Sequence, residues 1–341
     1  MSVAEAGERL DALSLSEGAP ASGARASHHP PTILVIGMAG SGKTSLVRRL
    51  QSHLFAASRP NYVINLDPAV ATLPYEPNVD IRDSVNYRNV MKEYGLGPNG
   101  AILTSLNLFA TRYDQVLGLL GKERDPALEL AIVDTPGQIE AFAWSASGAV
   151  ISESTAAAAP TAVLFVVDAP RAAAPQAFMA TMLQACSVAY RTRLPIVIAL
   201  NKADVARPEL LLDWMTDVDA FQTALDADTT YAATLSRSLA YVLERFYETL
   251  DAVPVSALTG EGVDDLFSSL NSAFEEYEKE YRPHLEARKR KIERLERKRR
   301  EADARAFRED REGDLRRAGA AGGGGARGGL GAVREEDAEG E

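Results

Sequence analysis

The residues best suited to chemistry form one glycine-rich run, Gly37-Met-Ala-Gly-Ser-Gly-Lys-Thr44, between an apolar segment and a helical one. Glycines let the backbone curl so that successive N–H groups converge on phosphate oxygens, and the dipole of the following helix adds partial positive charge. The Lys43 ammonium can reach the β- and γ-phosphates of a nucleotide, and the Thr44 hydroxyl is a ligand for Mg²⁺. The run therefore predicts a phosphate-binding loop. Its expected nucleotide contacts are Gly37, Gly40, Ser41, Gly42, Lys43, Thr44 and Ser45.

Two acidic segments are expected beside this loop. Asp134-Thr-Pro-Gly-Gln138 follows an apolar run, so Asp134 can hold Mg²⁺ through water and the Gly137 N–H can contact a γ-phosphate. Asp67, in Asn65-Leu-Asp-Pro-Ala69, can hold the water of Mg²⁺ or orient the attacking water. Each segment has a plain alternative as a turn. Their positions after the phosphate-binding loop favour the functional interpretation.

A third motif, Asn201-Lys-Ala-Asp204, closes another apolar run and predicts the choice of base. The Asp204 carboxylate can accept both the N1–H and the exocyclic N2–H of guanine, whereas adenine has no such donor pair. The aliphatic stem of Lys202 can lie along the base. Ser256-Ala-Leu258 follows the last apolar run, and the backbone N–H of Ala257 can point toward guanine O6. The order of these motifs favours GTP over ATP.

The elements that must position these motifs alternate between strand-like and helical patterns from residue 32 to residue 256. The apolar runs are short and rich in Val, Ile and Leu, which is typical of strands buried on both faces. They predict an α/β fold of the P-loop type, with a mainly parallel sheet flanked by helices. The expected strands are Thr32–Ile36, Tyr62–Leu66, Leu128–Val133, Ala162–Val167, Pro195–Leu200 and Val253–Ser256. The expected helices are Lys43–Ala57, Ser84–Tyr94, Leu106–Leu120, Gln176–Tyr190, Glu209–Leu225 and Leu235–Leu250.

The last two helices lie between two strands and predict a helical insertion at about residues 207–250. A further helix begins at Val263 and loses its apolar face near Tyr281, and Pro283 is expected to interrupt it. Three parts are therefore expected, with the nucleotide-binding domain in the middle. They are a disordered segment 1–30, a domain 31–284, and a tail 285–341 that is first charged, then Gly/Ala-rich and acidic, and is partly helical or disordered.

Charge and composition limit the kind of partner and compartment. The 341 residues carry a net charge of −11; residues 286–341 hold 16 basic and 14 acidic side chains, whereas the other 285 hold 21 and 34. An acidic body argues against direct binding to nucleic acid. The run Thr161–Val167 is too short to span a bilayer and residues 1–31 do not resemble a secretory signal, so a cytoplasmic protein with access to the nucleus is expected. The single cysteine, Cys186, is expected to be a buried apolar residue.

A last motif, Gly97-Pro-Asn-Gly100, lies between two helical segments and by itself is typical of a β-turn, with Asn able to adopt positive φ. Together with the other motifs, it resembles the GPN-loop GTPases, which are named for this Gly-Pro-Asn sequence. The likeness is greatest to their type 1 eukaryotic branch and covers roughly residues 31–284. The stretches that carry it are Gly37–Thr44, Val63–Val70, Tyr94–Gly100, Thr104–Asp114, Asp134–Glu140, Trp144–Gly148 and Glu276–Pro283.

This resemblance implies a GTPase switch that works by dimerisation, as a homodimer or as a heterodimer with a sister GPN-loop GTPase. In that family the Gly-Pro-Asn loop of one protomer approaches the phosphates bound by the other, so Asn99 would act in trans, with Gly97 and Pro98 fixing its backbone. Asp67 and Gln138 match family motifs and become candidates for organising the hydrolytic water. None of these motifs contains an evident arginine finger, so slow intrinsic turnover is expected.

The resemblance also implies a role in the assembly and nuclear import of RNA polymerase II, whose subunits would be partners, without contact to nucleic acid or membrane. Two alternatives stay open. One is a related ATP-driven P-loop ATPase, against which the Asn201–Asp204 motif argues. The other is a GTP-binding scaffold or chaperone-like adaptor with little hydrolysis.

Overall fold

Seven parallel strands form one sheet within residues 29–225 and 231–321, the part of the chain that the computed structural model describes. Their order across the sheet is β3-β2-β4-β1-β5-β6-β7, so β1 lies in the middle. The bounds are β1 Thr32–Ile36, β2 Asn61–Asn65, β3 Val79–Asp80, β4 Leu130–Asp134, β5 Thr161–Asp168, β6 Ile196–Asn201 and β7 Asp251–Val255. Six of them match the expected strands within a few residues, which confirms the parallel α/β fold.

Helices cover both faces of the sheet because its strands are apolar on both sides. In β1, Ile33 and Val35 belong to one buried layer, which also includes residues of α2 (Lys43–Ala56) and α14 (Val263–Glu276). Leu34 and Ile36 belong to the opposite layer, which includes residues of the remaining helices of the body. All residues of β1 and β4 are buried, so the ends of these central strands are rigid places from which to hold a site.

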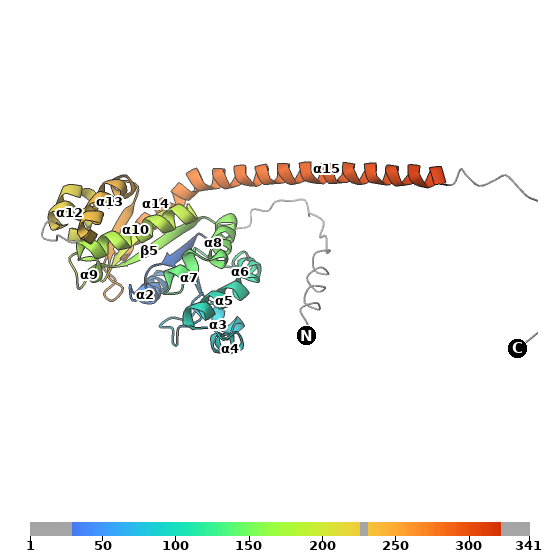
Figure 1. Cartoon of the computed structure of the whole chain (residues 1–341). Helices are drawn as coiled ribbons and strands as arrows, with labels where there is room; N and C mark the ends of the chain where they lie inside the picture. The colour runs from blue at the N-terminus through green and yellow to red at the C-terminus, as the bar shows by residue number, and fades with distance from the viewer. Residues whose placement is uncertain (1–28, 226–230, 322–341) are drawn as a thin grey trace, which may run out of the picture. The chain divides into compact units, whose positions relative to one another are not determined.

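The remaining helices of the body come in groups between the strands. Between β2 and β4 lie α3 Ile81–Ser84, α4 Tyr87–Glu93, α5 Pro98–Ala110 and α6 Tyr113–Leu120. Between β4 and β6 lie α7 Ile139–Ala143, α8 Ala146–Ala158, α9 Ala169–Ala172 and α10 Pro175–Thr192. Between β6 and β7 lie α11 Pro208–Thr216, α12 Val218–Leu225 and α13 Tyr231–Tyr247. Figure 1 shows α4–α6 and α12–α13 at opposite ends of the sheet.

The Gly-Pro-Asn motif lies at the start of a helix, and not in the β-turn that is typical of this motif taken alone. Helix α5 begins at Pro98, so Gly97 is its N-cap, and Asn99 lies in the first helical turn and has no positive φ. Proline suits this place because its fixed φ matches a helix and its missing N–H would have no intrahelical partner there. The helix expected over Leu106–Leu120 therefore begins earlier and is divided into α5 and α6.

Capping residues change two other expected helices: the one expected at Ser84–Tyr94 is α4, which begins only after Asn86, and the one expected at Glu209–Leu225 is divided at Asp217. The Asn86 side chain accepts a hydrogen bond from the Asn89 N–H (3.1 Å) and begins α4 after the short α3. Asp217 lies between α11 and α12, and its Oδ1 accepts from the Asp219 N–H at 2.9 Å. Asn and Asp favour such positions because their side chains satisfy backbone donors that have no helical partner. Apolar periodicity alone does not show where such capping residues begin or end a helix.

The sequence does not predict two further features of the body. Helices α7 and α8 follow Gly137 in a stretch rich in Ala and Ser, where no strong apolar period marks a helix. Ser145 begins α8 by accepting a hydrogen bond from the Gly148 N–H at 2.9 Å. The strand β3 has only two residues and pairs with the edge of β2, where Ile64 is opposite Val79. So short a strand has no recognisable pattern.

Helices α11–α13, in the region of the expected helical insertion, pack against α10. The core of this region is aromatic: the Phe178 ring lies 5.4 Å from Trp214 and 5.7 Å from Phe221, measured between ring centroids. Tyr247 at the end of α13 joins the same cluster, 6.2 Å from Phe178. The insertion is therefore tied to the body by a buried cluster. Cys186, on α10, is partly buried against this apolar layer, and burial raises the pKa of its thiol.

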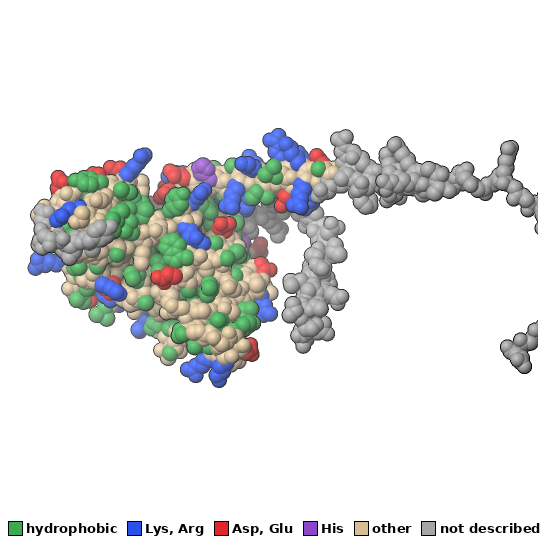
Figure 2. Space-filling model, viewed as in Figure 1, with side chains coloured by type: hydrophobic (Ala, Val, Ile, Leu, Met, Phe, Trp, Pro, Cys, Tyr) green, Lys and Arg blue, Asp and Glu red, His purple; other side chains and the backbone are tan. Residues whose placement is uncertain are grey.

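Residues 282–341 form a second unit, described up to Ala321 as the single helix α15 (Arg282–Ala321). Contrary to expectation, Pro283 does not end the helical run, because α15 follows directly on the π-helical segment η1 (Tyr277–Tyr281). A proline removes one helical hydrogen bond, and the π-helical segment before it is a local departure from α-helical hydrogen bonding at the same place. Figure 2 shows Lys and Arg side chains along α15.

The ends of the chain limit what the structure says about the expected parts. Of the segment 1–30 expected to be disordered, the structure describes only His29 and Pro30, and residues 322–341 lie outside the described part. Among the described residues, every helix is either too short or too polar to cross a membrane.

Candidate nucleotide-binding site

The glycine-rich run forms the loop between the central strand β1 and helix α2. Gly42 has a left-handed φ of 89° directly before α2, and a Cβ there would meet the side-chain amide nitrogen of Asn201. A Cβ on Gly37 would meet the backbone carbonyl oxygen of Val166 in β5. Both glycines are therefore required by space, and Gly42 also by its backbone conformation. The loop curls at the N-terminus of α2, as a phosphate-binding loop must.

Lys43, the first residue of α2, turns its side chain back over this loop. Its Nζ donates hydrogen bonds to the carbonyl oxygens of Gly37 (2.8 Å) and Met38 (3.1 Å). Burial lowers the pKa of this ammonium, while the neighbouring carboxylates of Asp134 and Asp67 act in the opposite direction. The charge of Lys43 is thus buried between the loop and two acidic residues.

Asp134 ends β4 and is only 1% exposed. Its Oδ2 accepts a hydrogen bond from the Tyr75 hydroxyl at 2.8 Å, and its buried Oδ1 has no hydrogen-bond partner among the described residues. Burial raises the pKa of Asp134 to about 6, although the bond from Tyr75 and the charge of Lys43 favour the ionised form. A buried carboxylate oxygen that lacks a donor is costly unless something positive approaches it.

These features fit a divalent cation. Thr44 is near enough to Asp134 to favour its ionised form, so a hydroxyl and an unpartnered carboxylate oxygen lie together. In the described residues no group of three or more acidic, His or Cys side chains could hold a metal ion alone. Mg²⁺ suits such a site because it keeps several waters and takes its other ligands from nucleotide phosphates. Thr44, Asp134 and Asp67 are the residues that would hold it.

Asp67 follows β2 and is held by short local hydrogen bonds. Its Oδ1 accepts from the Ala69 N–H at 2.9 Å, and its own N–H donates to Asn65 Oδ1 at 3.1 Å. The side chain lies close enough to Lys43 and Asp134 for its charge to act on both. The structure thus brings Asp67 to the phosphate loop, as the sequence predicts.

A single open pocket of about 410 Å³ collects most of the predicted phosphate and metal residues. Gly137 closes one side, because a Cβ on it would lie 3.4 Å from the Ala39 Cβ of the phosphate loop. The predicted residues that line this pocket are Gly40, Gly42, Lys43, Thr44, Ser45, Asp67, Gly137 and Gln138. Asp134 does not line the pocket itself; it is buried and close enough to Lys43 for its charge to act on it.

The predicted base motifs meet around Asn201 at the end of β6. Asn201 Nδ2 donates to the Ser41 carbonyl oxygen (2.8 Å), and its Oδ1 accepts from the Ala257 N–H (3.1 Å). One buried amide therefore ties the phosphate loop to the Ser256–Leu258 loop. Because the Ala257 N–H is already bonded to Asn201, its contact with guanine O6 stays a prediction.

Lys202 and Asp204 extend this side of the site. Lys202 Nζ donates to the Gly40 carbonyl oxygen (3.0 Å) and pairs with Asp168 Oδ2 (2.7 Å), so its stem passes beside the phosphate loop. The exposed Asp204 accepts a hydrogen bond from the Ser256 hydroxyl at 2.6 Å. A second pocket of about 570 Å³, lined by Asn201, Lys202, Asp204 and Ala257, adjoins the phosphate loop at Gly42 and Ser45.

The Gly-Pro-Asn motif is not part of either pocket. Gly97, Pro98 and Asn99 are exposed at the start of α5, and none of them lines the pockets described above. The Pro98 carbonyl oxygen accepts a hydrogen bond from the Tyr87 hydroxyl at 3.3 Å. Within one chain, therefore, the structure does not bring Asn99 together with the phosphate-binding residues.

Comparison with known proteins agrees with the family resemblance found in the sequence. The family model described as "Conserved hypothetical ATP binding protein" matches residues 35–276. The GPN-loop GTPase 1 of Dictyostelium discoideum is 52% identical over 257 residues, which cover 75% of this chain and 65% of that protein. The GPN-loop GTPase 1 of Schizosaccharomyces pombe is 48% identical over 269 residues, which cover 76% of this chain and 73% of that protein. The chain belongs to the GPN-loop GTPase family.

A solved structure supports this membership. The GTPase PAB0955 in apo form from Pyrococcus abyssi matches with a TM-score of 0.62 and 27% identity, covering 71% of this chain and 97% of that one. As a GPN-loop GTPase, the chain is by family a P-loop hydrolase that acts on GTP. The chain spans about two thirds of the length of the first curated relatives.

Sequence reasoning missed several residues that shape the site of this GPN-loop GTPase. Tyr75 bonds to Asp134, Arg82 pairs with Asp80, and Arg49 holds the Ser256–Leu258 loop by donating to the Ala257 carbonyl oxygen at 3.0 Å. None of these side chains lies in a recognised motif, and Arg49 and Ala257 are far apart in the sequence. The only available signal was the short spacing of Asp80 and Arg82 after the Asn65–Ala69 segment.

Proposed function

We propose that this chain is a GTP-driven switch that binds GTP with Mg²⁺, hydrolyses its β–γ phosphoanhydride bond and changes its dimeric state as it does so. The observation that carries the proposal is the 410 Å³ pocket, which is lined by Lys43, Thr44 and Asp67, three residues that all act on the buried Asp134. The neighbouring pocket beside Asp204 supports guanine as the base.

Each residue has a role that follows from its position. Backbone N–H groups of the loop and the Lys43 ammonium hold the phosphates, and they stabilise charge that grows on the γ-phosphate during cleavage. Mg²⁺, when bound, supplies further positive charge to the phosphate oxygens. Asp67 and Gln138 line the same pocket and are placed to orient the attacking water. A preorganised site of this kind performs hydrolysis mostly by positioning.

The choice of base is tested by substitution of one carboxylate. Asp204→Asn replaces an acceptor by a group that cannot accept both guanine donors, so we expect the affinity for GTP to fall and the preference for GTP over ATP to shrink. Titration calorimetry with each nucleotide measures both values. Equal affinity of the wild type for GTP and ATP would favour the ATP-driven alternative.

Hydrolysis itself is tested under single-turnover conditions. We expect Lys43→Ala to lower the rate of GTP cleavage by about 100-fold, because it removes a positioned charge from the phosphates. A wild type that cleaves GTP no faster than Lys43→Ala would mean that the protein is a GTP-binding scaffold or adaptor.

The dimer is proposed from the family resemblance and from the exposed Gly-Pro-Asn motif, which contacts neither pocket of its own chain. In the proposed dimer, Asn99 of one protomer acts at the phosphates of a second copy or of a sister GPN-loop GTPase. The Lys43→Ala variant lacks the lysine that would contact the phosphates but keeps Asn99. The Asn99→Ala variant keeps Lys43 but lacks Asn99. A mixture of the two variants should therefore hydrolyse GTP faster than either one alone. A mixture that shows only the average of the two rates would exclude action in trans within a homodimer.

The cellular role is proposed from resemblance alone. The switch would assist the assembly and nuclear import of RNA polymerase II, bind polymerase subunits in the cytoplasm and have access to the nucleus. Affinity capture with GTP-bound and GDP-bound protein tests this, because polymerase subunits should be retained by one form more than by the other. Equal retention, or none, would refute the polymerase role without affecting the GTPase proposal.

A further inference from the structure

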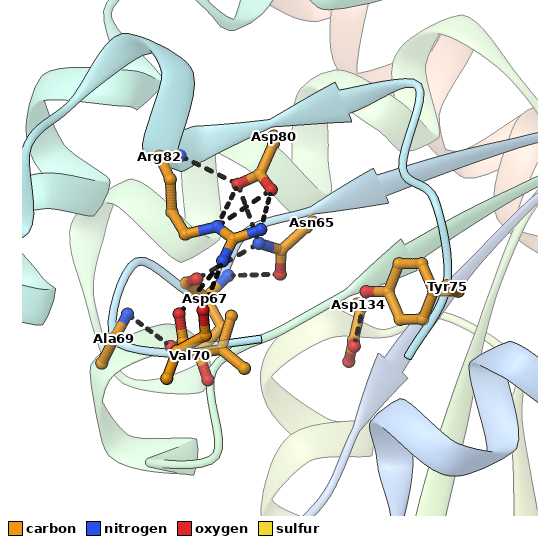
Figure 3. Close-up of polar contacts among 9 residues, drawn as sticks. Asn65, Asp67, Ala69, Val70, Tyr75, Asp80, Arg82 and Asp134 are labelled. Atoms are coloured by element: carbon orange, nitrogen blue, oxygen red, sulfur yellow. Dashed lines mark hydrogen bonds and ion pairs between the residues drawn. The ribbon is translucent and has the colours of Figure 1, made fainter. Parts of the chain in front are cut away.

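The guanidinium of Arg82 connects an acidic residue to the backbone that follows Asp67 (Figure 3). Its Nε lies 3.0 Å from both carboxylate oxygens of Asp80, and its Nη2 donates to Asp80 Oδ2 at 2.6 Å. Its Nη1 donates to the carbonyl oxygens of Val70 (3.2 Å) and Ala71 (3.3 Å). A planar guanidinium can make both sets of contacts at once, whereas the compact ammonium of a lysine cannot.

Asp80 is a fixed partner for this guanidinium. The residue is 7% exposed, and its Oδ1 also accepts hydrogen bonds from the Arg82 N–H (2.9 Å) and from Asn65 Nδ2 (3.0 Å). Burial alone would raise its pKa, but the hydrogen bonds from Arg82 and Asn65 and the charge of Arg82 together bring the pKa below its usual value. Asp80 therefore stays ionised at neutral pH.

Asn65 joins the same network to Asp67. Its Nδ2 donates to the Asp67 carbonyl oxygen at 3.2 Å, and its Oδ1 accepts from the Asp67 N–H at 3.1 Å. Both backbone polar groups of Asp67 are therefore held by one buried side chain, which is itself fixed by Asp80. Arg82 holds the two carbonyls at Val70 and Ala71, just beyond the Asp67–Ala69 turn.

We propose that Arg82, acting through Asp80 and Asn65, is a positioning residue for GTP hydrolysis, because this network fixes Asp67 against the phosphate pocket. We call these three residues the Arg82 clamp. Arg82 itself lies outside the residues that line the 410 Å³ pocket, so it does not act as an arginine that touches the phosphates. The inference rests on the proposed function and adds a residue that no motif of the sequence identifies.

The experiment separates positioning from simple stability. Arg82→Lys keeps a positive charge beside Asp80 but cannot also hold the Val70 and Ala71 carbonyls, and Arg82→Met removes both functions. We expect Arg82→Lys to cleave GTP about 10-fold more slowly in single turnover, and Arg82→Met about 100-fold more slowly, since small misplacements of a catalytic group have effects of this size. The affinity for GDP, measured in EDTA, should change by less than about 2-fold, because the loop and base pocket that bind it are intact.

A matched control is Arg59→Met. Arg59 lies just before β2, at the end of the strand opposite to Asp67, and pairs with Glu129 at 2.5 Å on the surface. The Arg59→Met variant removes an arginine–carboxylate pair that does not contact the Arg82 clamp, so GTP cleavage should stay at the wild-type rate.

Three outcomes would overturn the clamp. The first is wild-type cleavage by both Arg82 variants, and the second is a loss of GDP affinity in parallel with the loss of cleavage. In either case a wild type that cleaves GTP leaves the proposed function standing. The third is a wild type without GTP cleavage, which refutes the proposed function and the clamp together.

Discussion

At the scale of single residues, the site contains buried groups of opposite charge that stabilise each other. Asp134 and Lys43 are both buried, and each owes part of its ionisation to the other. The Tyr75 hydroxyl donates a hydrogen bond to Asp134 Oδ2, and burial and nearby carboxylates raise the pKa of this hydroxyl, so it keeps the proton that it donates. Buried carboxylates are tolerated when they are paired in this way.

The Tyr75 hydroxyl should therefore contribute to stability. Tyr75→Phe leaves the buried Oδ2 of Asp134 without its donor, and we expect the free energy of unfolding to fall by about 1–3 kcal/mol. Urea denaturation of nucleotide-free protein at pH 8 measures the change. Tyr190→Phe is the matched control, because Tyr190 is 81% exposed and its hydroxyl can bond to water. Equal stability of the two variants would show that the bond to Asp134 contributes nothing.

At the scale of elements, the site exists because loops at the ends of different strands are tied together. The loop after β1 is the predicted phosphate-binding loop, the loop after β6 carries Asp204, and Asn201 bonds to the loops after β1 and β7. Arg49 adds a second tie from α2: its Nε and Nη2 donate to the Ala257 and Leu258 carbonyl oxygens. Substitutions that remove these hydrogen bonds should thus affect nucleotide binding and GTP cleavage to different extents.

Removal of the α2 tie should affect nucleotide binding more than catalysis. Arg49→Met removes both of its hydrogen bonds to the Ser256–Leu258 loop and leaves the bond to Asn201, and we expect the affinities for GDP and GTP to fall together by at least about 10-fold, the value of a single charge-assisted hydrogen bond. The rate of cleavage of bound GTP should not change, because the phosphate pocket keeps its contacts. Fluorescent-nucleotide titration and single-turnover assays measure the two quantities.

Arg48→Met is the control for charge in this experiment. Arg48 lines the same 570 Å³ pocket but is exposed and is not one of the donors to the loop. An equal loss of affinity in both variants would show that the effect comes from charge, and would contradict a role for the hydrogen bonds from Arg49 to the Ser256–Leu258 loop.

At the scale of the whole molecule, the two units are stabilised by different forces. The body is held by two apolar layers on the faces of the sheet. In α15, by contrast, the side chains described over residues 282–302 are mostly exposed and charged, with ion pairs such as Arg290 to Glu286 (3.2 Å) and Arg297 to Glu301 (3.7 Å). Pairs four residues apart each stabilise a helix by only about 0.2–0.5 kcal/mol and weaken in salt.

Salt should therefore act on α15 and not on the body. Between about 0.1 M and 1 M NaCl, where the screening length falls from about 10 Å to 3 Å, we expect helical ellipticity at 222 nm to decrease. The midpoint of the cooperative thermal transition should stay the same, because it reports the buried layers. A chain that ends at Tyr281 should show no such decrease; if it does, the salt-sensitive helix lies in the body.

The sequence predicted much of the fold because its signals are local. Apolar runs such as Thr32–Ile36 identify buried strands, and the glycines before Lys43 identify the phosphate loop by spacing alone. The elements that were missed have weak local patterns: the two-residue β3 and the Ala-rich α8. The start of α5 was misplaced because its first residue, Pro98, is typical both of a turn and of a helix start. Pro283 is also ambiguous by itself, since a proline is expected to interrupt a helix and here follows a π-helical segment within a helical run.

By itself, the sequence determined which groups can bind phosphate, metal and guanine, since Lys43, Asp134 and Asp204 belong to motifs whose chemistry depends on residue type and short spacing. Only the tertiary structure decided how these groups are supported. The contacts of Tyr75 with Asp134 and of Arg49 with Ala257 join segments that are distant in the chain, and those of Arg82 with Val70 and Ala71 depend on the path of the loop between them. Such contacts arise from the order of the strands in the sheet, which no local pattern encodes.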